Sequence, residues 1–399
     1  MNESTKLTFL GITHGRHHVA PQYENLPTGN WIYTSDDATV VWIKAEHASS
    51  GRPSYELLVS DVTNTGCVGT EQATSSHVKD GVDVQGFVLN AFPRWDEEMI
   101  LRVRPFNGHI AEGQFVVTNA GHTAFADLTP EPLPATKSDG DFEVTLTNLT
   151  AGVPLPHWRG RPAPEDDPAN KCVRIAFGFQ QNGRSVTNWR PWLVQTSDAV
   201  GNHLKNVISD YPQDGIYFYP QPGHPEMAQM DGYFYRPGLW PDESAWKVRL
   251  EFTRTSGFSD DEILTLTNLP VRAGSQQDAD EEWTWDGSKT NFTFTPGTVN
   301  GVHVKVLEPL LVPDRFQAGQ RHLSVIIYAD PNPTSMGMHL TLLEATDDQG
   351  HAVPTQFPVP WAGHFSLDFP DPRDTKTLSL RLALHKSRFV EFTVKPSKL

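Results

Sequence analysis

The sequence has few of the features that identify a protein class. Only two of its 399 residues are cysteines, Cys67 and Cys172. They fall in different copies of an internal repeat, so we expect free buried thiols and no disulfide framework. No apolar run approaches the roughly 20 residues that a membrane-spanning helix needs, so we expect no membrane insertion. The first residues lack the basic and apolar regions of a signal peptide, which predicts a cytoplasmic protein or an exported one whose signal has been removed.

Positive charge is also scarce. The chain has 32 lysines and arginines against 48 aspartates and glutamates, a formal net charge of −16. A nucleic-acid backbone is bound by clustered basic side chains, and an anionic membrane surface attracts the same residues. The charge balance therefore argues against both as partners.

The common catalytic signatures are absent. The sequence has no Gly-x-Ser-x-Gly elbow, no His-Glu-x-x-His, no Walker A loop and no strand followed by Gly-x-Gly-x-x-Gly. A carboxylate pair or a dispersed Ser-His-Asp triad is recognised by geometry and not by order, so an enzyme without a signature stays open. We expect no cofactor and favour a non-enzymatic protein.

What is present indicates an all-β fold. Hydrophobic residues make up 38% of the chain and charged residues 20%, which is typical of a folded protein. The 32 prolines and 30 glycines are spread along the sequence, as expected for many short strands joined by turns. No convincing helical period interrupts this pattern.

One strand pattern occurs three times. Residues 246–252 (WKVRLEF), 101–104 (LRVR) and 378–382 (LSLRL) alternate apolar and polar residues and carry an arginine at the matching place. This alternation is the period of a strand with one buried face. The repeated arginine is either functional or, as is more usual on the solvent face of a strand, paired with a carboxylate on the neighbouring strand.

Other strand and turn signals recur in the same order around this pattern. Each copy ends in a closing strand, at residues 114–117, 263–266 and 391–394. A Pro-rich segment at 129–140 and an acidic segment at 274–289 separate the copies. The repeat predicts three tandem antiparallel β-sandwich domains, over residues 1–130, 141–273 and 290–399.

Each copy also carries an aspartate before a glycine turn, at Asp61, Asp198 and Asp347. An aspartate side chain can cap backbone N–H groups in a turn, while the glycine adopts a positive φ. Calcium binding is the alternative, but one aspartate per loop supplies too few oxygen ligands. We interpret the three corners as turns.

Two other segments resemble metal sites. His14, His17 and His18 cluster, but Gly15 indicates a turn, and neighbouring residues of a strand point to opposite faces. No carboxylate or cysteine lies at a natural spacing from them. The acidic run 278–286 either holds calcium between domains or is a solvated linker whose tryptophans dock on a domain. We expect no metal site.

The second copy is lengthened by two segments, 154–170 and 207–231, and the latter is rich in aromatic residues. Long loops on a rigid β-fold concentrate binding sites, and tyrosine or tryptophan can stack on sugar rings or anchor a protein partner. The alternative is that these side chains plug the end of the sandwich or contact a neighbouring domain. The candidate ligand- or partner-binding residues, two of them in the acidic linker, are Trp158, Tyr211, Tyr217, Tyr219, Tyr233, Trp240, Trp283 and Trp285.

The repeated pattern is similar to the immunoglobulin-like or fibronectin-type-III-like sandwiches that occur in tandem in bacterial proteins. The second copy resembles a group of uncharacterised bacterial proteins through residues 188–191 (NWRP), 232–242 (GYFYRPGLWPD) and 246–258 (WKVRLEFTRTSGF). This resemblance implies no activity, so no functional residue is transferred from it. No copy has the paired cysteines that flank a tryptophan in antibody domains, so the sandwich must rely on packing alone.

These observations favour a non-catalytic structural or interaction protein that binds a protein partner or self-assembles by pairing of edge strands. Two alternatives stay open. A carbohydrate-binding array would use Tyr217, Tyr219, Tyr233, Trp240 or Trp158 as stacking platforms. A hydrolase would have an unrecognised site in the second domain, with at least two titratable groups of shifted pKa in a pocket.

Overall fold

The chain was analysed as a computed structural model. It describes residues 5–21, 31–46, 55–61, 67–69, 72–79, 82–89, 97–105, 113–118, 128–154, 171–199, 203–207, 216–220, 228–234, 239, 243–275, 278, 294–313, 321–331, 333, 336–353, 359–361, 364–370 and 375–398. The expectation of an all-β chain is confirmed, because strands dominate this part of the chain. No helix within it is long and apolar enough to cross a membrane.

The chain divides into two compact units. The first consists of Met1–Val186, Pro191–Glu251 and Phe389–Leu399, and the second of Thr187–Arg190 and Phe252–Arg388. The first unit contains the first sequence copy and most of the second, and the second unit contains the end of the second copy and most of the third.

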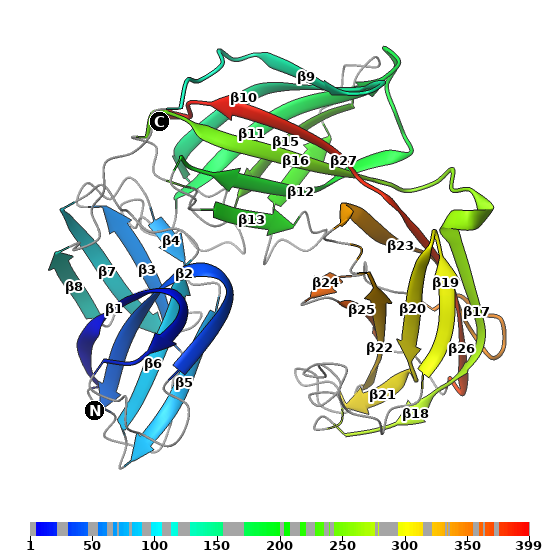
Figure 1. Ribbon diagram of the computed structural model, residues 1–399, viewed down its shortest axis with the longest axis horizontal. Coiled ribbons are helices and arrows are strands. Elements are labelled where there is room, and N and C mark those ends of the chain that lie inside the picture. Colours follow the sequence, from blue (N-terminus) through cyan, green and yellow to red (C-terminus); the bar gives the residue numbers. More distant parts are fainter. Residues whose placement is uncertain are drawn as a thin grey trace. The chain divides into compact units, whose positions relative to one another are not determined.

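The first copy forms two four-stranded antiparallel sheets (Figure 1). One has the order β1-β2-β6-β5, with the bounds Lys6–Val19, Trp31–Glu46, Val82–Leu89 and Gln72–Lys79. The other has the order β4-β3-β7-β8, with the bounds Cys67–Gly69, Tyr55–Asp61, Glu98–Pro105 and Gly113–Thr118. Val40, Trp42 and Val84 of the first sheet belong to one buried hydrophobic cluster.

The second copy also forms two sheets. The first has the order β14-β15-β11-β10-β28, and β9 pairs with β10 as well. Its bounds are Ile216–Pro220, Ala228–Phe234, Lys171–Gln181, Phe142–Pro154, Ser397–Lys398 and, for β9, Ala135–Asp139. The second has the order β13-β12-β16-β27, with the bounds His203–Val207, Trp189–Ser197, Trp246–Arg254 and Arg388–Val394.

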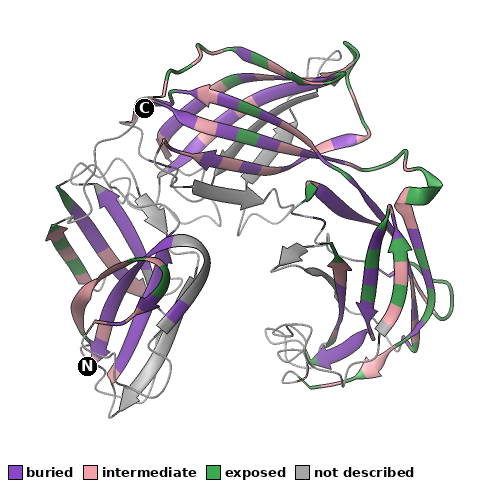
Figure 2. Cartoon of the chain, viewed as in Figure 1, coloured by how far each residue is buried: buried purple, intermediate pink, exposed green. Residues whose placement is uncertain are grey.

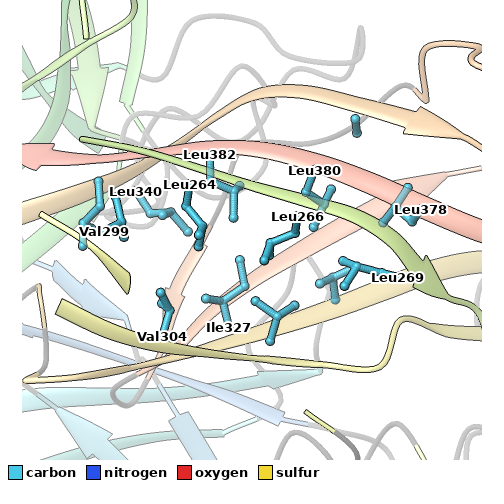
Figure 3. Packing of buried hydrophobic residues seen from close by; sticks show 14 of the residues in the cluster. Leu264, Leu266, Leu269, Val299, Val304, Ile327, Leu340, Leu378, Leu380 and Leu382 are labelled. Carbon is cyan, nitrogen blue, oxygen red and sulfur yellow. The ribbon is translucent and has the colours of Figure 1, made fainter. Parts of the chain in front are cut away.

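The second unit contains two sheets that share one hydrophobic core. One has the order β17-β26-β23, with the bounds Ile263–Pro270, Thr377–Lys386 and Met338–Asp347. The other has the order β18-β21-β22-β20-β19, and β25 pairs with β22 and β24. Its bounds are Arg272–Ala273, Leu310–Pro313, Arg321–Asp330, Val302–Leu307, Phe294–Val299, His364–Pro370 and Val359–Trp361. Figure 3 shows side chains from both sheets, such as Leu380 and Ile327, in the same core.

The three arginine strands have the predicted buried face. On β16, Val248 and Leu250 are fully buried while Arg249 between them is exposed, and Figure 2 shows such alternation along many strands. The arginines differ in their contacts. Arg249 lies over the ring of Phe389, 4.2 Å from its centroid, and Arg102 of β7 donates a hydrogen bond to Ser60 Oγ at 2.8 Å.

The closing strands of the last two copies pair differently from the order expected from the repeat. The strand expected to close the second copy is β17, which pairs with β26 of the third copy. The strand expected to close the third copy is β27, which joins the β13-β12-β16-β27 sheet of the second. Val390, Phe392 and Val394 of β27 are buried there. Both sequences have the alternation of a strand, but alternation does not specify the partner strand.

Candidate functional site

The outer strand β8 of the first copy is the best candidate for an interaction site. Its sequence, GQFVVT, places aromatic and β-branched residues in succession, which favours a strand. It pairs on one side with β7, from Glu98 opposite Thr118 to Val103 opposite Gly113. No described strand pairs with its other side. The outward backbone groups of such a strand are a template for pairing with another chain.

The inner face of β8 fixes the strand in place. The ring of Phe115 lies 6.2 Å from that of Phe9 on β1, centroid to centroid. A Cβ atom on Gly113 would lie 2.8 Å from Leu7 Cδ1, so only glycine fits there without displacing the leucine. The opposite face presents Gln114, Val116 and Thr118, all exposed. Val116 is 59% exposed, an unusual value for a large apolar side chain of this fold.

β8 lacks the features that protect natural sheet edges. Such edges carry charged residues or prolines, which oppose pairing with another chain. Among the described outer strands of at least four residues, β8 alone has neither. The others contain a charged residue in β1, β5, β9, β13, β23 and β27, and a proline in β14, β17 and β19. The composition of β8 therefore makes it the least protected of these edges.

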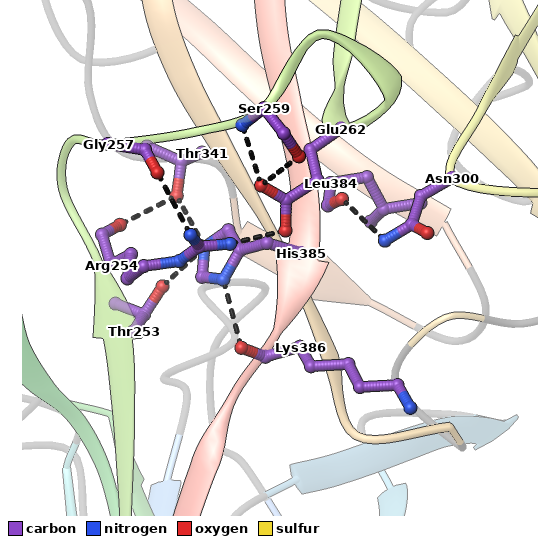
Figure 4. Close-up of polar contacts among 10 residues, drawn as sticks. All are labelled: Thr253, Arg254, Gly257, Ser259, Glu262, Asn300, Thr341, Leu384, His385 and Lys386. Carbon is purple, nitrogen blue, oxygen red and sulfur yellow. Dashed lines mark hydrogen bonds and ion pairs between the residues drawn. The ribbon is translucent and has the colours of Figure 1, made fainter. Parts of the chain in front are cut away.

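A cluster of polar side chains in the second unit is joined by several hydrogen bonds and an ion pair (Figure 4). Arg254 at the end of β16 forms an ion pair with Glu262, and its guanidinium lies 5.1 Å from the ring centroid of Phe258. The Glu262 carboxylate also accepts hydrogen bonds from Ser259 N and Oγ, at 2.9 and 3.0 Å. These contacts close the turn between β16 and β17 and stabilise it.

His385 lies at the centre of this cluster and is fully buried. Its Nδ1 lies 3.1 Å from the carbonyl oxygen of Lys386, so this nitrogen carries the proton and donates. Its Nε2 then accepts a hydrogen bond from the Thr253 hydroxyl at 3.0 Å, and Thr341 Oγ1 lies 3.3 Å away (Figure 4). Burial lowers the pKa of His385 to about 4. Both nitrogens are engaged within the protein, which is the arrangement of a structural histidine.

A second histidine packs beside the first. The ring of His339 is 5.9 Å from that of His385 in an edge-on arrangement, and its residue is 2% exposed. Burial, followed by the charges of His385 and Arg190, lowers the pKa of His339 well below its ordinary value. Both imidazoles are therefore neutral at neutral pH.

Two carboxyl groups of the second copy also have an unusual environment. Burial, followed by the charge of Asp198, raises the pKa of Glu243 to about 9. Both carboxyl oxygens of Glu243 are closed to solvent, and Asp198 is 5% exposed. A neutral carboxylic acid beside a second carboxyl group is the arrangement of general acid catalysis. A substrate would have to reach these buried oxygens, so we interpret the pair as structural.

Most of the aromatic candidates lie outside the described residues, namely Trp158, Tyr211, Trp240, Trp283 and Trp285. The other three lie on the neighbouring strands β14 and β15. The register pairs Tyr217 with Tyr233, and Tyr219 with Asp231. The structure thus brings two of the predicted positions directly opposite each other at the outer part of one sheet.

The three histidines of the predicted cluster, His14, His17 and His18, all lie on β1. The turn expected at Gly15 is a bulge inside the continuous strand β1, where Gly15 has a φ of +117° and the register shifts. His18 is buried, with Nδ1 3.0 Å from Thr13 Oγ1, while His17 is exposed, as expected for opposite faces. Within the described ranges, no group of three or more histidine, cysteine or acidic residues is placed to hold a metal ion.

The aspartate corners have different roles. Asp347 forms the predicted turn, because its Oδ1 accepts hydrogen bonds from the backbone N–H groups of Gln349 and His351 at 2.9 and 2.8 Å. Gly350 follows with a φ of +79°. Asp198 instead lies buried near Glu243. The side chain of Asp61 lies outside the described part of the chain.

The sequence reasoning missed three features of these sites. It placed a closing strand at 114–117 without noting that residues 113–118 carry no charge, although this signal is visible in the sequence. It missed the contact of His385 with Thr253, because the two residues are 132 positions apart. It also missed the proximity of Glu243 to Asp198, which no spacing indicates. No family model, curated protein or solved structure matches this chain.

Proposed function

We propose that this chain is a non-catalytic structural or interaction protein, built of tandem immunoglobulin-like β-sandwich domains, that associates by adding a strand to the outer edge of β8. The observation that carries the proposal is the composition of this edge, which has neither charge nor proline and exposes Val116. In strand addition, main-chain hydrogen bonds supply affinity and alternate side chains supply specificity. The position of Phe115 against Phe9 supports a fixed edge that needs no rearrangement to bind.

A library of random peptides displayed on phage tests whether β8 accepts a strand, whatever the natural partner. We expect enriched peptides with alternating apolar residues that bind the wild type and lose binding to Val116→Lys, because lysine is a residue that natural edges use against pairing. Thr136→Lys is the matched control, since Thr136 is exposed on the charged outer strand β9. Enrichment that both variants retain, or no enrichment at all, would refute strand addition at β8.

Carbohydrate binding is the second candidate, favoured by the pairing of Tyr217 with Tyr233. Aromatic residues at adjacent strand positions can form a platform for a sugar ring. A glycan screen of the wild type and a Tyr217→Ala, Tyr219→Ala double variant tests it. Binding that disappears in the variant supports this candidate, and the absence of any bound glycan rejects it.

A further inference from the structure

We infer that the strand added to β8 is β8 of a second copy of this chain, paired antiparallel about Val116. The inference rests on the proposed function and names its partner. Pairing of identical strands about a two-fold axis gives an isologous contact, in which the same residues face each other from both copies. The four-stranded sheets β4-β3-β7-β8 of the two molecules would then join into one continuous sheet.

The sequence of β8 is self-complementary in this register. With Val116 opposite Val116 of the other copy, Gln114 faces Thr118 and Phe115 faces Val117. Polar residues thus meet polar residues, and apolar residues meet apolar ones. Directly opposite side chains in an antiparallel pair stabilise the sheet when they match, and like charges destabilise it.

The exposure pattern is consistent with this register and excludes a shift by one residue. Gln114, Val116 and Thr118 are exposed, whereas Phe115 and Val117 are partly buried on the inner face. Opposite residues of paired strands share a face of the sheet, and a shift by one residue moves each side chain to the other face. A register centred on Val116 keeps the inner faces of both copies on one side. A shift by one residue would place Val116 opposite an inner-face residue.

Charge restricts where two copies can meet. Each molecule carries a formal charge of −16, so two molecules have a net electrostatic repulsion. β8 contributes no charge to the contact, and no ion pair within it would be weakened by salt. Added salt therefore screens the repulsion and strengthens this association, whereas it weakens a contact held by ion pairs.

Single cysteines test both the partner and the register. Opposite residues of an antiparallel pair have Cα atoms about 4.5–5.5 Å apart, within the range of a disulfide. Val116→Cys should therefore form a cross-linked dimer when its two thiols are oxidised by oxidised glutathione. Gln114→Cys alone should not, because two copies of residue 114 would lie about 14 Å apart. A mixture of Gln114→Cys and Thr118→Cys should cross-link.

The wild type under the same oxidant gives the background from Cys67 and Cys172. All three substituted positions are exposed, so the variants should unfold at the same temperature as the wild type. Dimers from Val116→Cys and from the mixture, at several times the yield of Gln114→Cys alone, support the inference. Equal yields from all variants would indicate random collision and overturn the register. If no variant forms a dimer, a second molecule of this chain is not the partner. The phage selection would still decide whether β8 accepts an added strand.

Discussion

The Nε2 atom of His385 lies 3.0 Å from the hydroxyl of Thr253, so the end of β16 and the end of β26 are joined by a buried hydrogen bond. Thr253 is fully buried, so its hydroxyl is not in contact with bulk water. Removing one partner of a buried hydrogen bond leaves the other without its full set of contacts, at a cost of about 1–3 kcal/mol. We expect Thr253→Val to lower the free energy of unfolding by that amount.

Urea-induced unfolding measures this change, and Thr253→Ser is the control because it keeps the hydroxyl. Serine lacks only a methyl group and should cost about 1 kcal/mol or less. A Thr253→Val variant as stable as Thr253→Ser would show that the hydrogen bond contributes nothing.

The second unit should lose stability in acid because of its two buried histidines. In the unfolded chain both titrate near 6.5. In the folded chain burial lowers the pKa of His385 to about 4, and that of His339 lies well below its ordinary value. The unfolded state therefore binds more protons as pH falls from 6.5 towards 4, and stability falls through this window. Above pH 6.5 both groups are neutral in either state, and the effect vanishes.

For His385 alone, the expected loss between pH 7 and pH 4.5 is roughly 2 kcal/mol. The measurement is the free energy of unfolding in urea at both pH values, for the wild type and for His385→Gln, which cannot titrate. Carboxylates contribute equally to both proteins, so the difference between the two pH dependences isolates the histidine. An identical pH dependence would assign the acid sensitivity to other groups.

The predictable part of the fold was the buried face of each strand. The alternation in residues 246–252 correctly placed Val248 and Leu250 in the core and Arg249 outside. The corner at Asp347 followed from the preference of aspartate for capping a turn, which is a local property.

The partner of each strand was not predictable. The sequences of β17 and β27 both have the pattern of a strand that closes its own domain. The structure instead pairs β17 with β26 and β27 with β16. The same reason kept β8 from being identified as a site. Its lack of charge is visible in the sequence, but its outermost position in the sheet depends on pairing with β7. His385 and Thr253 likewise meet through packing that no local pattern encodes.

Glu243 should weaken the first unit at alkaline pH. Its pKa is raised to about 9 by burial and by Asp198, while in the unfolded chain it titrates near its ordinary value of 4.5. Between these values the unfolded state releases a proton that the folded state holds, so stability falls as pH rises from 4.5 to 9. Glu243→Gln is neutral at every pH and should be more stable than the wild type by roughly 1–3 kcal/mol at pH 8.

The extra stability of Glu243→Gln over the wild type should shrink towards zero at pH 4.5. At that pH, Glu243 is protonated in the folded state and half protonated in the unfolded one. Thermal unfolding of both proteins at pH 5, 7 and 8 gives the trend. A gain that is constant with pH would mean that the substitution acts through packing and not through the proton.

The thiol of Cys172 should be inert in the folded protein. It is 1% exposed, and its Sγ donates a hydrogen bond to the Val153 carbonyl at 3.3 Å. Burial raises its pKa to about 12, which suppresses the reactive thiolate. In a Cys67→Ala background, we expect no reaction with Ellman's reagent at pH 8 over the time in which an unfolded sample reacts completely. Rapid labelling of the native protein would contradict the burial of this thiol.

The association of two copies through β8 is tested most directly by the solution mass as a function of concentration, measured by light scattering. The mass of one chain is 44.5 kDa. The account predicts that the wild type rises towards twice this value as concentration increases, and further when salt is added, while Val116→Lys stays at the mass of one chain. Thr136→Lys should behave like the wild type. A wild type that keeps the mass of one chain at every concentration, or a Val116→Lys variant that associates equally well, would contradict it.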